Sequence, residues 1–154
     1  MGTYGEKARA LFLEGYNCSQ SVLVAFCEET GLDRETALLL SSSLGGGMGR
    51  LREVCGAVSG MFLAAGLLYG YTDPEDREAK TAHYARIQQL AGKFSEKNGS
   101  IVCRELLKLG THRSAPVPEA RTTEYYKKRP CADLVACAAE ILEQYMEDYK
   151  RAEG

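Results

Sequence analysis

The sequence lacks an excess of positive charge. Its formal net charge is −2 and its isoelectric point is near 5.8, so it carries no electrostatic footprint for a polyanion. We therefore expect no binding to nucleic acid. The amino terminus, residues 1–9, is polar and lacks the apolar segment of a secretory signal, and Glu6 stands where N-myristoylation needs Ser or Thr. These absences predict a cytoplasmic protein without a lipid anchor.

The sequence also lacks any Cys-x-x-Cys pair, although it contains six cysteines. This absence leaves a thioredoxin-type active site and an ordinary zinc knuckle without support. A cytoplasmic location argues against permanent structural disulfides. The cysteines are therefore either small buried hydrophobic residues, which is a common role of free cysteine, or groups with a metal, cluster or transient redox role.

No segment shows the alternating pattern of a β-strand, and no internal repeat or low-complexity segment occurs. Apolar residues recur instead at helical spacing, and capping residues or glycines delimit the segments. We expect helices near residues 4–15, 18–31, 33–44, 53–71, 74–97, 100–109 and from 130 onward, with a loop at 111–129 that holds at most one helical turn. The sequence thus predicts one all-α domain over residues 1–154, a compact bundle of six or seven helices around a central apolar, glycine-containing helix.

The expected central helix is the most apolar part of the chain, with no charged residue between Glu53 and Asp73. Such a helix could approach ~28 Å, which is near the thickness of a bilayer core. Glycines dilute its apolar character, and the amphipathic helices elsewhere need a partner, so we favour a bundle core over a membrane span. Gly56 and Gly60 lie one turn apart and form a ridge without side chains, which lets other backbones approach Cys55 closely.

A glycine cluster at residues 45–49 precedes this helix. It lacks the Lys-Ser/Thr pair and the preceding strand of a phosphate-binding loop, so we expect no nucleotide site. We interpret it as a tight turn that brings Cys55 to the centre of the bundle. Arg50 and Arg52 follow the cluster and can raise the thiolate character of a cysteine or contact an anionic ligand.

Four cysteines are predicted at helix starts, namely Cys18, Cys55, Cys103 and Cys131. The unpaired N–H groups and partial positive charge at a helix start favour the thiolate, which is the nucleophilic and metal-binding form. At 100° per residue, Cys27 lies about 180° around the helix from Cys18, and Cys137 lies about 120° from Cys131. We therefore interpret Cys27 and Cys137 as core or surface thiols and the other four cysteines as the site.

Four segments in a fixed order carry a resemblance to a known family. They are residues 15–20, 45–60 and 99–107, together with Cys131. The chain resembles the C_GCAxxG_C_C family of redox-active proteins over almost its whole length, although its central motif reads Cys-Gly-Ala-x-x-Gly where the family label writes glycine first. The resemblance implies a small helical prokaryotic protein with four characteristic cysteines, a redox role and frequent linkage to transporter genes.

Three hypotheses for function follow. In the first, Cys18, Cys55, Cys103 and Cys131 converge to form the site of a thiol–disulfide oxidoreductase, with Cys18 as the nucleophile and Cys55 as the resolving partner. In the second, Cys18, Cys55, Cys103 and Cys131 are ligands of a metal ion or an iron–sulfur cluster, whose identity the sequence leaves open. In the third, the exposed part of the helix at 79–94 or the loop at 111–129 docks to a membrane transporter. The redox partner is unknown, and a homo-oligomer is an open alternative.

The two histidines receive less weight than the cysteines. His83 falls on the inner side of its helix, near Ile87, so we expect an ordinary partly buried histidine. His112 lies in the loop, where we expect solvent exposure rather than a role as a fifth ligand or a proton donor.

Overall fold

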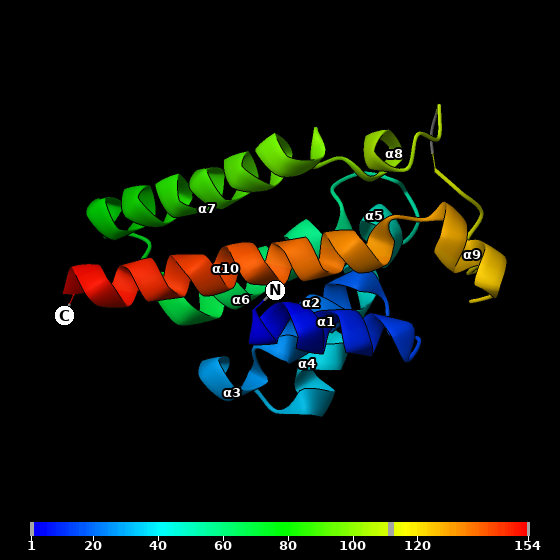
Figure 1. Ribbon diagram of the computed structural model, residues 1–154. Helices are drawn as coiled ribbons and strands as arrows, with labels where there is room; N and C mark the ends of the chain where they lie inside the picture. Colours follow the sequence, from blue (N-terminus) through cyan, green and yellow to red (C-terminus); the bar gives the residue numbers. More distant parts are fainter. Residues whose placement is uncertain (1, 111–112, 154) are drawn as a thin grey trace.

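A computed structural model of the protein describes residues 2–110 and 113–153 (Figure 1). The helices are α1 (Thr3–Leu13), α2 (Cys18–Ala25), α3 (Cys27–Thr30), α4 (Arg34–Ser41), the 3-10 turn η1 (Ser42–Leu44), α5 (Gly45–Met48), α6 (Gly56–Tyr69), α7 (Arg77–Asn98), α8 (Cys103–Leu106), α9 (Thr123–Lys128) and α10 (Cys131–Glu153). The expected all-α class is confirmed. Within the described ranges the only strand-like pairing is an isolated antiparallel bridge between Val54 and Val102.

The longest helices set the shape of the bundle. In Figure 1, α10 runs across the molecule, with α7 along one side and α1 along the other. Helix α6 packs against α2, α7 and α10, and α1 packs against α2 and α10. The short helices α5, α8 and α9 gather at one end, beside the start of α10 (Figure 1). This end, which we call the cysteine end, holds the candidate site.

Helix α6 occupies the centre of the bundle, as the sequence predicts. Its fully buried side chains are those of Ala57, Val58, Met61, Ala64 and Ala65. At 100° per residue these five side chains span about 120° of the helix, and the buried residues Gly56, Ser59 and Gly60 extend the enclosed surface to the other sides of its first turns. No helix in the described parts of the chain is both long and apolar enough to cross a membrane.

The glycine ridge of α6 allows α2 to lie unusually close. A Cβ atom at Gly60 would lie 2.6 Å from the carbonyl oxygen of Ser19, and one at Gly56 would lie 3.0 Å from that of Leu44. A Cβ at Gly56 would also overlap the Sγ atom of Cys18. The predicted close approach is therefore confirmed, and it sets Cys18 against the first turn of α6.

Helix α7 begins later than the sequence predicts. The Asp73-Pro74 pair was the expected start, but Asp73 Oδ1 accepts a hydrogen bond from the N–H of Glu75 at 2.9 Å and so closes a turn. Asp76 caps the helix instead, because its Oδ1 accepts from the N–H of Ala79 at 3.0 Å. Two nearby aspartates compete for the same role, and the sequence alone does not rank them.

Three other boundaries also differ from expectation. The helix predicted for residues 18–31 breaks at Phe26, whose backbone (φ −106°, ψ 14°) separates α2 from α3. Helix α6 begins at Gly56 rather than near residue 53. Ser100 does not cap α8 directly, because its hydroxyl accepts from the N–H of Val102 at 2.9 Å and the helix starts at Cys103. Each shift places a cysteine nearer to the end of its helix.

Candidate functional site

The four cysteines predicted for the site all lie at helix starts. Cys18, Cys103 and Cys131 are the first residues of α2, α8 and α10, and Cys55 is the N-cap of α6. The predicted capping box fixes the start of α2. The Asn17 side chain accepts from the N–H of Gln20 at 2.9 Å, and Gln20 Oε1 accepts from the N–H of Asn17 at 3.1 Å.

These cysteines line one small cavity, which we call the cysteine cavity. Its volume is about 20 Å³, and its lining residues are Cys18, Arg52, Cys55, Gly56, Cys103, Leu106, Leu107, Cys131 and Leu134. Cys55 and Cys103 are each 6 % exposed, whereas Cys18 and Cys131 are less deeply buried. Cys27 and Cys137 do not line this cavity, and Cys137 Sγ instead accepts a hydrogen bond from Asn98 Nδ2 at 3.4 Å.

A short backbone bridge holds Cys55 and Cys103 side by side. The N–H of Cys55 donates to the carbonyl oxygen of Ile101 at 2.7 Å, and the N–H of Cys103 donates to that of Glu53 at 2.6 Å. These two hydrogen bonds pair the segment that precedes α6 with the segment that precedes α8, so the two helices start next to each other. Sequence reasoning missed this bridge because a single bridge leaves no alternating pattern of apolar residues.

Burial changes the expected protonation of these thiols. Desolvation in the cavity raises the pKa of Cys18, raises the pKa of Cys55 well above its ordinary value, and raises the pKa of Cys131 to about 12. The backbone N–H groups of Gly46 and Ser19 act in the opposite direction on the pKa of Cys18 but do not outweigh burial. The expectation that these helix starts yield thiolates was therefore wrong, because at neutral pH the three groups are thiols.

Arg52 supplies a positive charge at the cavity wall. The residue is only 4 % exposed. Its Nη1 donates to Cys103 Sγ at 3.6 Å, and its Nε donates to Ser114 Oγ at 2.9 Å. Within the part of the chain that the structure describes, no carboxylate forms an ion pair with it. A guanidinium in this position favours negative charge at the cavity.

The glycine cluster places Arg52 by an unusual backbone path. A Cβ atom at Gly47 would lie 2.6 Å from Cys103 Cβ, so only glycine lets the turn pack onto α8. Beyond it, Met48, Arg50 and Arg52 have φ angles of 70°, 67° and 63°. Non-glycine residues rarely adopt this left-handed conformation, and such strain is concentrated at functional sites.

A second, larger cavity of about 270 Å³ adjoins the cysteine cavity, and we call it the arginine pocket. The two cavities share Cys18, Arg52, Leu107 and Cys131. The arginine pocket is further lined by Phe12, Asn17, Ser42, Gly45, Gly46, Gly49, Arg50, Pro116, Pro118, Glu119, Arg121, Tyr125 and Arg129. Cys18 and Cys131 therefore face this outer pocket as well as the inner cavity, whereas Cys55 and Cys103 line only the inner one.

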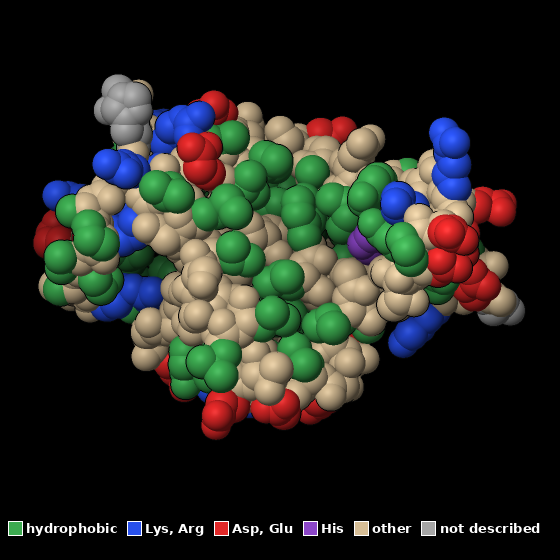
Figure 2. All heavy atoms as spheres, turned by 180° about the vertical axis from the view of Figure 1, so that it is seen from behind, with side chains coloured by type: hydrophobic (Ala, Val, Ile, Leu, Met, Phe, Trp, Pro, Cys, Tyr) green, Lys and Arg blue, Asp and Glu red, His purple; other side chains and the backbone are tan. Residues whose placement is uncertain are grey.

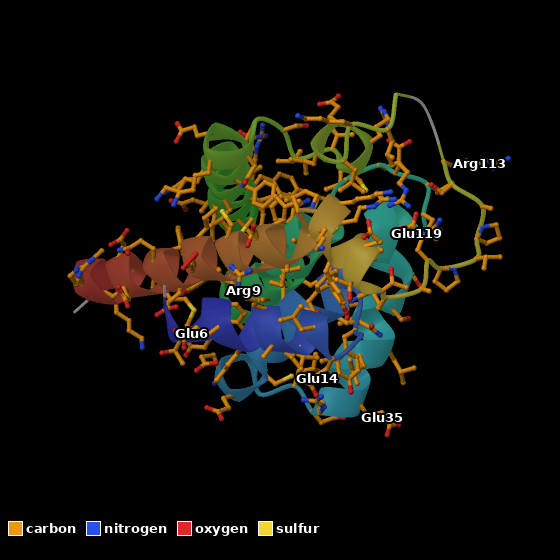
Figure 3. All side chains as sticks on the ribbon, turned by 45° about the vertical axis from the view of Figure 1, so that its right-hand side comes forward. Glu6, Arg9, Glu14, Glu35, Arg113 and Glu119 are labelled. Atoms are coloured by element: carbon orange, nitrogen blue, oxygen red, sulfur yellow. The ribbon has the colours of Figure 1, made fainter. Side chains whose placement is uncertain are left out.

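The long loop before α9 forms the outer wall of the arginine pocket. In Figure 3, Glu119 lies on this loop near α9, and Arg113 points away from the body of the protein. Glu119 Oε1 pairs with Arg129 Nη2 at 2.7 Å, and Arg121 donates to the carbonyl oxygens of Phe12 and Tyr16 at 2.7 and 2.8 Å. Sequence reasoning missed these residues because the loop has no periodic pattern, although its two prolines and its length mark it as unusual.

The histidines do not belong to this site. His83 lies on α7, and its Nδ1 is 2.8 Å from Arg86 Nη1. Burial and the nearby guanidinium lower the pKa of His83, so its ring is neutral at pH 7. His83 is thus a structural histidine, as expected, and it is buried rather than partly buried. His112 lies outside the residues that the structure describes.

The second hypothesis requires side chains that converge on a metal ion. Among residues 2–110 and 113–153, no group of three or more His, Cys, Asp or Glu side chains is arranged to hold one. The four cysteines share a cavity but do not present a preformed coordination site. The described residues thus offer no preformed site for the metal hypothesis, which stays a prediction, and we derive no chemical step from it.

Comparison with known protein families agrees with the resemblance seen in the sequence. The family described as "Putative redox-active protein (C_GCAxxG_C_C)" matches residues 16–145. No curated protein and no solved structure matches the chain. The match spans most of the sequence and contains all four cysteines of the cysteine cavity. The chain therefore belongs to the C_GCAxxG_C_C family.

Proposed function

We propose that the protein is a thiol–disulfide oxidoreductase whose reactive groups are Cys18, Cys55, Cys103 and Cys131. The observation that carries this proposal is that these four cysteines, from four separate segments, line a single cavity. Two further observations support it. The chain belongs to a family described as redox-active. The arginine pocket also connects Cys18 and Cys131 to solvent.

Cys18 is the best placed nucleophile among the four. Cys18 and Cys131 both border the arginine pocket, where a substrate can reach them. The pKa of Cys131 is raised by burial to about 12 even though Arg129 and a hydrogen bond with Tyr125 act in the opposite direction, whereas the pKa of Cys18 is raised by burial against the effect of the N–H groups of Gly46 and Ser19. The thiolate is the attacking species, so Cys18 reacts more readily.

Cys55 is the natural resolving partner. It lines the same cavity as Cys18. Burial is the largest cause of the raised pKa of Cys55, and the charge of a Cys18 thiolate is the second. In the first step the Cys18 thiolate attacks a substrate disulfide, forms a mixed disulfide and expels one thiolate. In the second step the Cys55 thiolate attacks Cys18 Sγ and expels the other thiolate, and the two protons that Cys18 and Cys55 lose pass to the two released thiolates. The substrate gains two electrons, the protein holds a Cys18–Cys55 disulfide, and a dithiol reductant restores both thiols.

A count of thiols before and after oxidation tests this proposal. The test uses full-length protein purified without oxygen, in which Cys27→Ser and Cys137→Ser remove the two thiols outside the cavity. One equivalent of a small disulfide should remove two of the four remaining thiols, and excess dithiothreitol should restore them. The added change Cys18→Ser should prevent the loss.

Two outcomes would overturn the proposal. An unchanged thiol count under mild oxidation would remove the redox chemistry. The second outcome comes from metal analysis of the same sample. One metal ion or cluster per chain, with all four thiols protected from alkylation, would make the four cysteines ligands rather than redox groups.

A further inference from the structure

The arginine pocket has a strong imbalance of charge. Four arginines line it, Arg50, Arg52, Arg121 and Arg129, against the single carboxylate of Glu119. That carboxylate is already paired with Arg129. Figure 2, which views the molecule from behind, shows Lys and Arg side chains around a hollow at this end of the protein. The remaining three guanidinium groups have no carboxylate partner within the described part of the chain.

The buried charge of Arg52 is the least satisfied of these. Its partners are a hydroxyl group and a sulfur atom, which is an incomplete shell for a guanidinium with five N–H donors. A charge taken out of water normally needs a counter-ion, and the side chain borders both cavities. An anion bound in the arginine pocket would supply that counter-ion.

Arg50 and Arg121 hold their charge at the same pocket. Arg50 Nε donates to the carbonyl oxygen of Ala115 at 2.7 Å, and Arg121 lies over the ring of Phe12 at 4.0 Å from its centre. These contacts orient the two guanidinium groups without neutralising them. The left-handed backbone at Arg50 and Arg52 puts both residues on the pocket wall at the cost of local strain.

The size of the pocket limits the ligand. About 270 Å³ is slightly below the range of ordinary small-molecule sites, so the pocket suits a compact molecule rather than a folded partner. One end of such a molecule would meet the arginines, and the other would reach Cys18 and the cysteine cavity.

We propose that the arginine pocket binds the negatively charged end of a small disulfide and presents its sulfur–sulfur bond to Cys18. This inference rests on the proposed function and names the substrate class. Exchange of a dianionic disulfide with Cys18 and Cys55 releases two anionic thiols and leaves the protein disulfide. A dithiol reductant then returns the protein to its starting state.

Three small disulfides that differ chiefly in charge provide the test. They are 3,3′-dithiodipropionate (anionic), bis(2-hydroxyethyl) disulfide (neutral) and cystamine (cationic). Each exchange rate with the reduced Cys27→Ser/Cys137→Ser protein is divided by the rate with dithiothreitol, which removes intrinsic differences in reactivity. At low ionic strength the anionic disulfide should be preferred to the cationic one by at least about 10-fold. The preference should fall as salt is added.

Matched arginine variants assign the preference to the pocket. Arg50→Gln should reduce it several-fold and Arg52→Gln should abolish it, whereas Arg52→Lys should keep part of it because the charge remains. Arg151→Gln is the control, because Arg151 lies near the carboxyl terminus, paired with Asp148, and should leave the preference unchanged. If Arg52→Gln fails to fold, competition by inorganic phosphate at constant ionic strength decides, since phosphate should slow only the anionic disulfide.

The outcomes separate the two proposals. Exchange with all three disulfides at similar normalised rates, unaffected by Arg50→Gln and by phosphate, would overturn the substrate class and leave the oxidoreductase intact. No exchange with any of the three would overturn both.

Discussion

The two ends of the bundle each hold an arginine in a very different setting. At the cysteine end, Arg52 contacts a hydroxyl group and a sulfur atom and borders two cavities. At the opposite end, Arg86 Nε donates to the hydroxyl of Tyr145 at 2.7 Å, and its Nη1 lies 3.2 Å from the carbonyl oxygen of Tyr69 and 2.8 Å from His83 Nδ1. The rings of Tyr69 and Tyr145 also face its guanidinium group.

Under the proposed function, this difference separates a structural arginine, Arg86, from a ligand-binding one, Arg52. At the opposite end, which we call the tyrosine end after Tyr69 and Tyr145, groups of the protein itself satisfy the guanidinium, so Arg86 joins α6, α7 and α10 together. At the cysteine end, Arg52 lines two cavities and its backbone adopts the strained left-handed conformation. Side chains that the fold does not need to complete its own bonds are the ones available to a ligand.

The largest expected contrast between the two ends concerns reactivity. Cys18→Ser should lower the rate of exchange with 3,3′-dithiodipropionate by at least about 100-fold, because it removes the attacking sulfur. Tyr145→Phe at the tyrosine end should leave the rate within about 2-fold. Stopped-flow or absorbance measurements of released thiol provide the rates. A Cys18→Ser protein with nearly full activity would transfer the nucleophile to another cysteine.

Within α6, a glycine near the cysteine end and a glycine farther along the helix should respond oppositely to alanine substitution. Gly60→Ala should lower the free energy of unfolding by about 2–3 kcal/mol, because its Cβ would lie 2.6 Å from the Ser19 carbonyl oxygen. Gly66→Ala should raise it by about 0.5–1 kcal/mol, since a Cβ there meets nothing within 4 Å and alanine is the better helix former. Urea unfolding measures both values. Equal destabilisation by the two changes would contradict the close packing of α2 on the cysteine end of α6.

Substitution of Arg86 should mainly lower stability, whereas substitution of Arg52 should mainly lower the rate of disulfide exchange. Arg86→Gln should lower the free energy of unfolding by about 1–3 kcal/mol, because it breaks charged hydrogen bonds to Tyr145 and Tyr69. Arg52→Gln should cost less than about 1 kcal/mol, since it also relieves a buried charge that lacks a carboxylate. Urea unfolding and the exchange assay, run on both variants, test this. Greater destabilisation by Arg52→Gln would make Arg52 the structural residue.

The smallest expected effect is a difference in alkaline stability. Burial raises the pKa of Cys131 to about 12, so the stability from its neutral thiol is complete below the ordinary thiol pKa and is lost as pH rises toward 12. Between pH 8 and pH 10 the wild type should lose about 1 kcal/mol more than Cys131→Ser, given a limit of about 1.4 kcal/mol per pH unit for one group.

Tyr69 offers the matched control at the tyrosine end. Burial also raises its pKa, but tyrosine titrates from a higher ordinary value, so its contribution is lost only above about pH 10. Tyr69→Phe should therefore change the loss between pH 8 and pH 10 by less than about 0.5 kcal/mol. Unfolding curves at the two pH values decide, and an identical loss in Cys131→Ser and wild type would show that Cys131 titrates normally.

Local signals in the sequence were sufficient for much of the cysteine end. The capping box at Asn17 and Gln20 and the glycine ridge at Gly56 and Gly60 act over one or two turns, and both were predicted correctly. The start of α7 was not, because Asp73 and Asp76 offer equivalent caps and only the surrounding structure selects one. The protonation of the thiols was also mispredicted, since desolvation depends on neighbours that the sequence does not reveal.

The sequence by itself determined the helical class, the apolar centre and the location of four cysteines at helix starts, because helical periodicity and capping depend on residues close together in the chain. The sequence also predicted that these cysteines form one site, and the tertiary structure shows the cavity that they line. Only the tertiary structure decided that burial keeps three of them as thiols and that the aperiodic loop supplies Arg121 and Arg129 to the pocket beside them. Cavities and desolvation arise from contacts between distant segments, and no local pattern records those contacts.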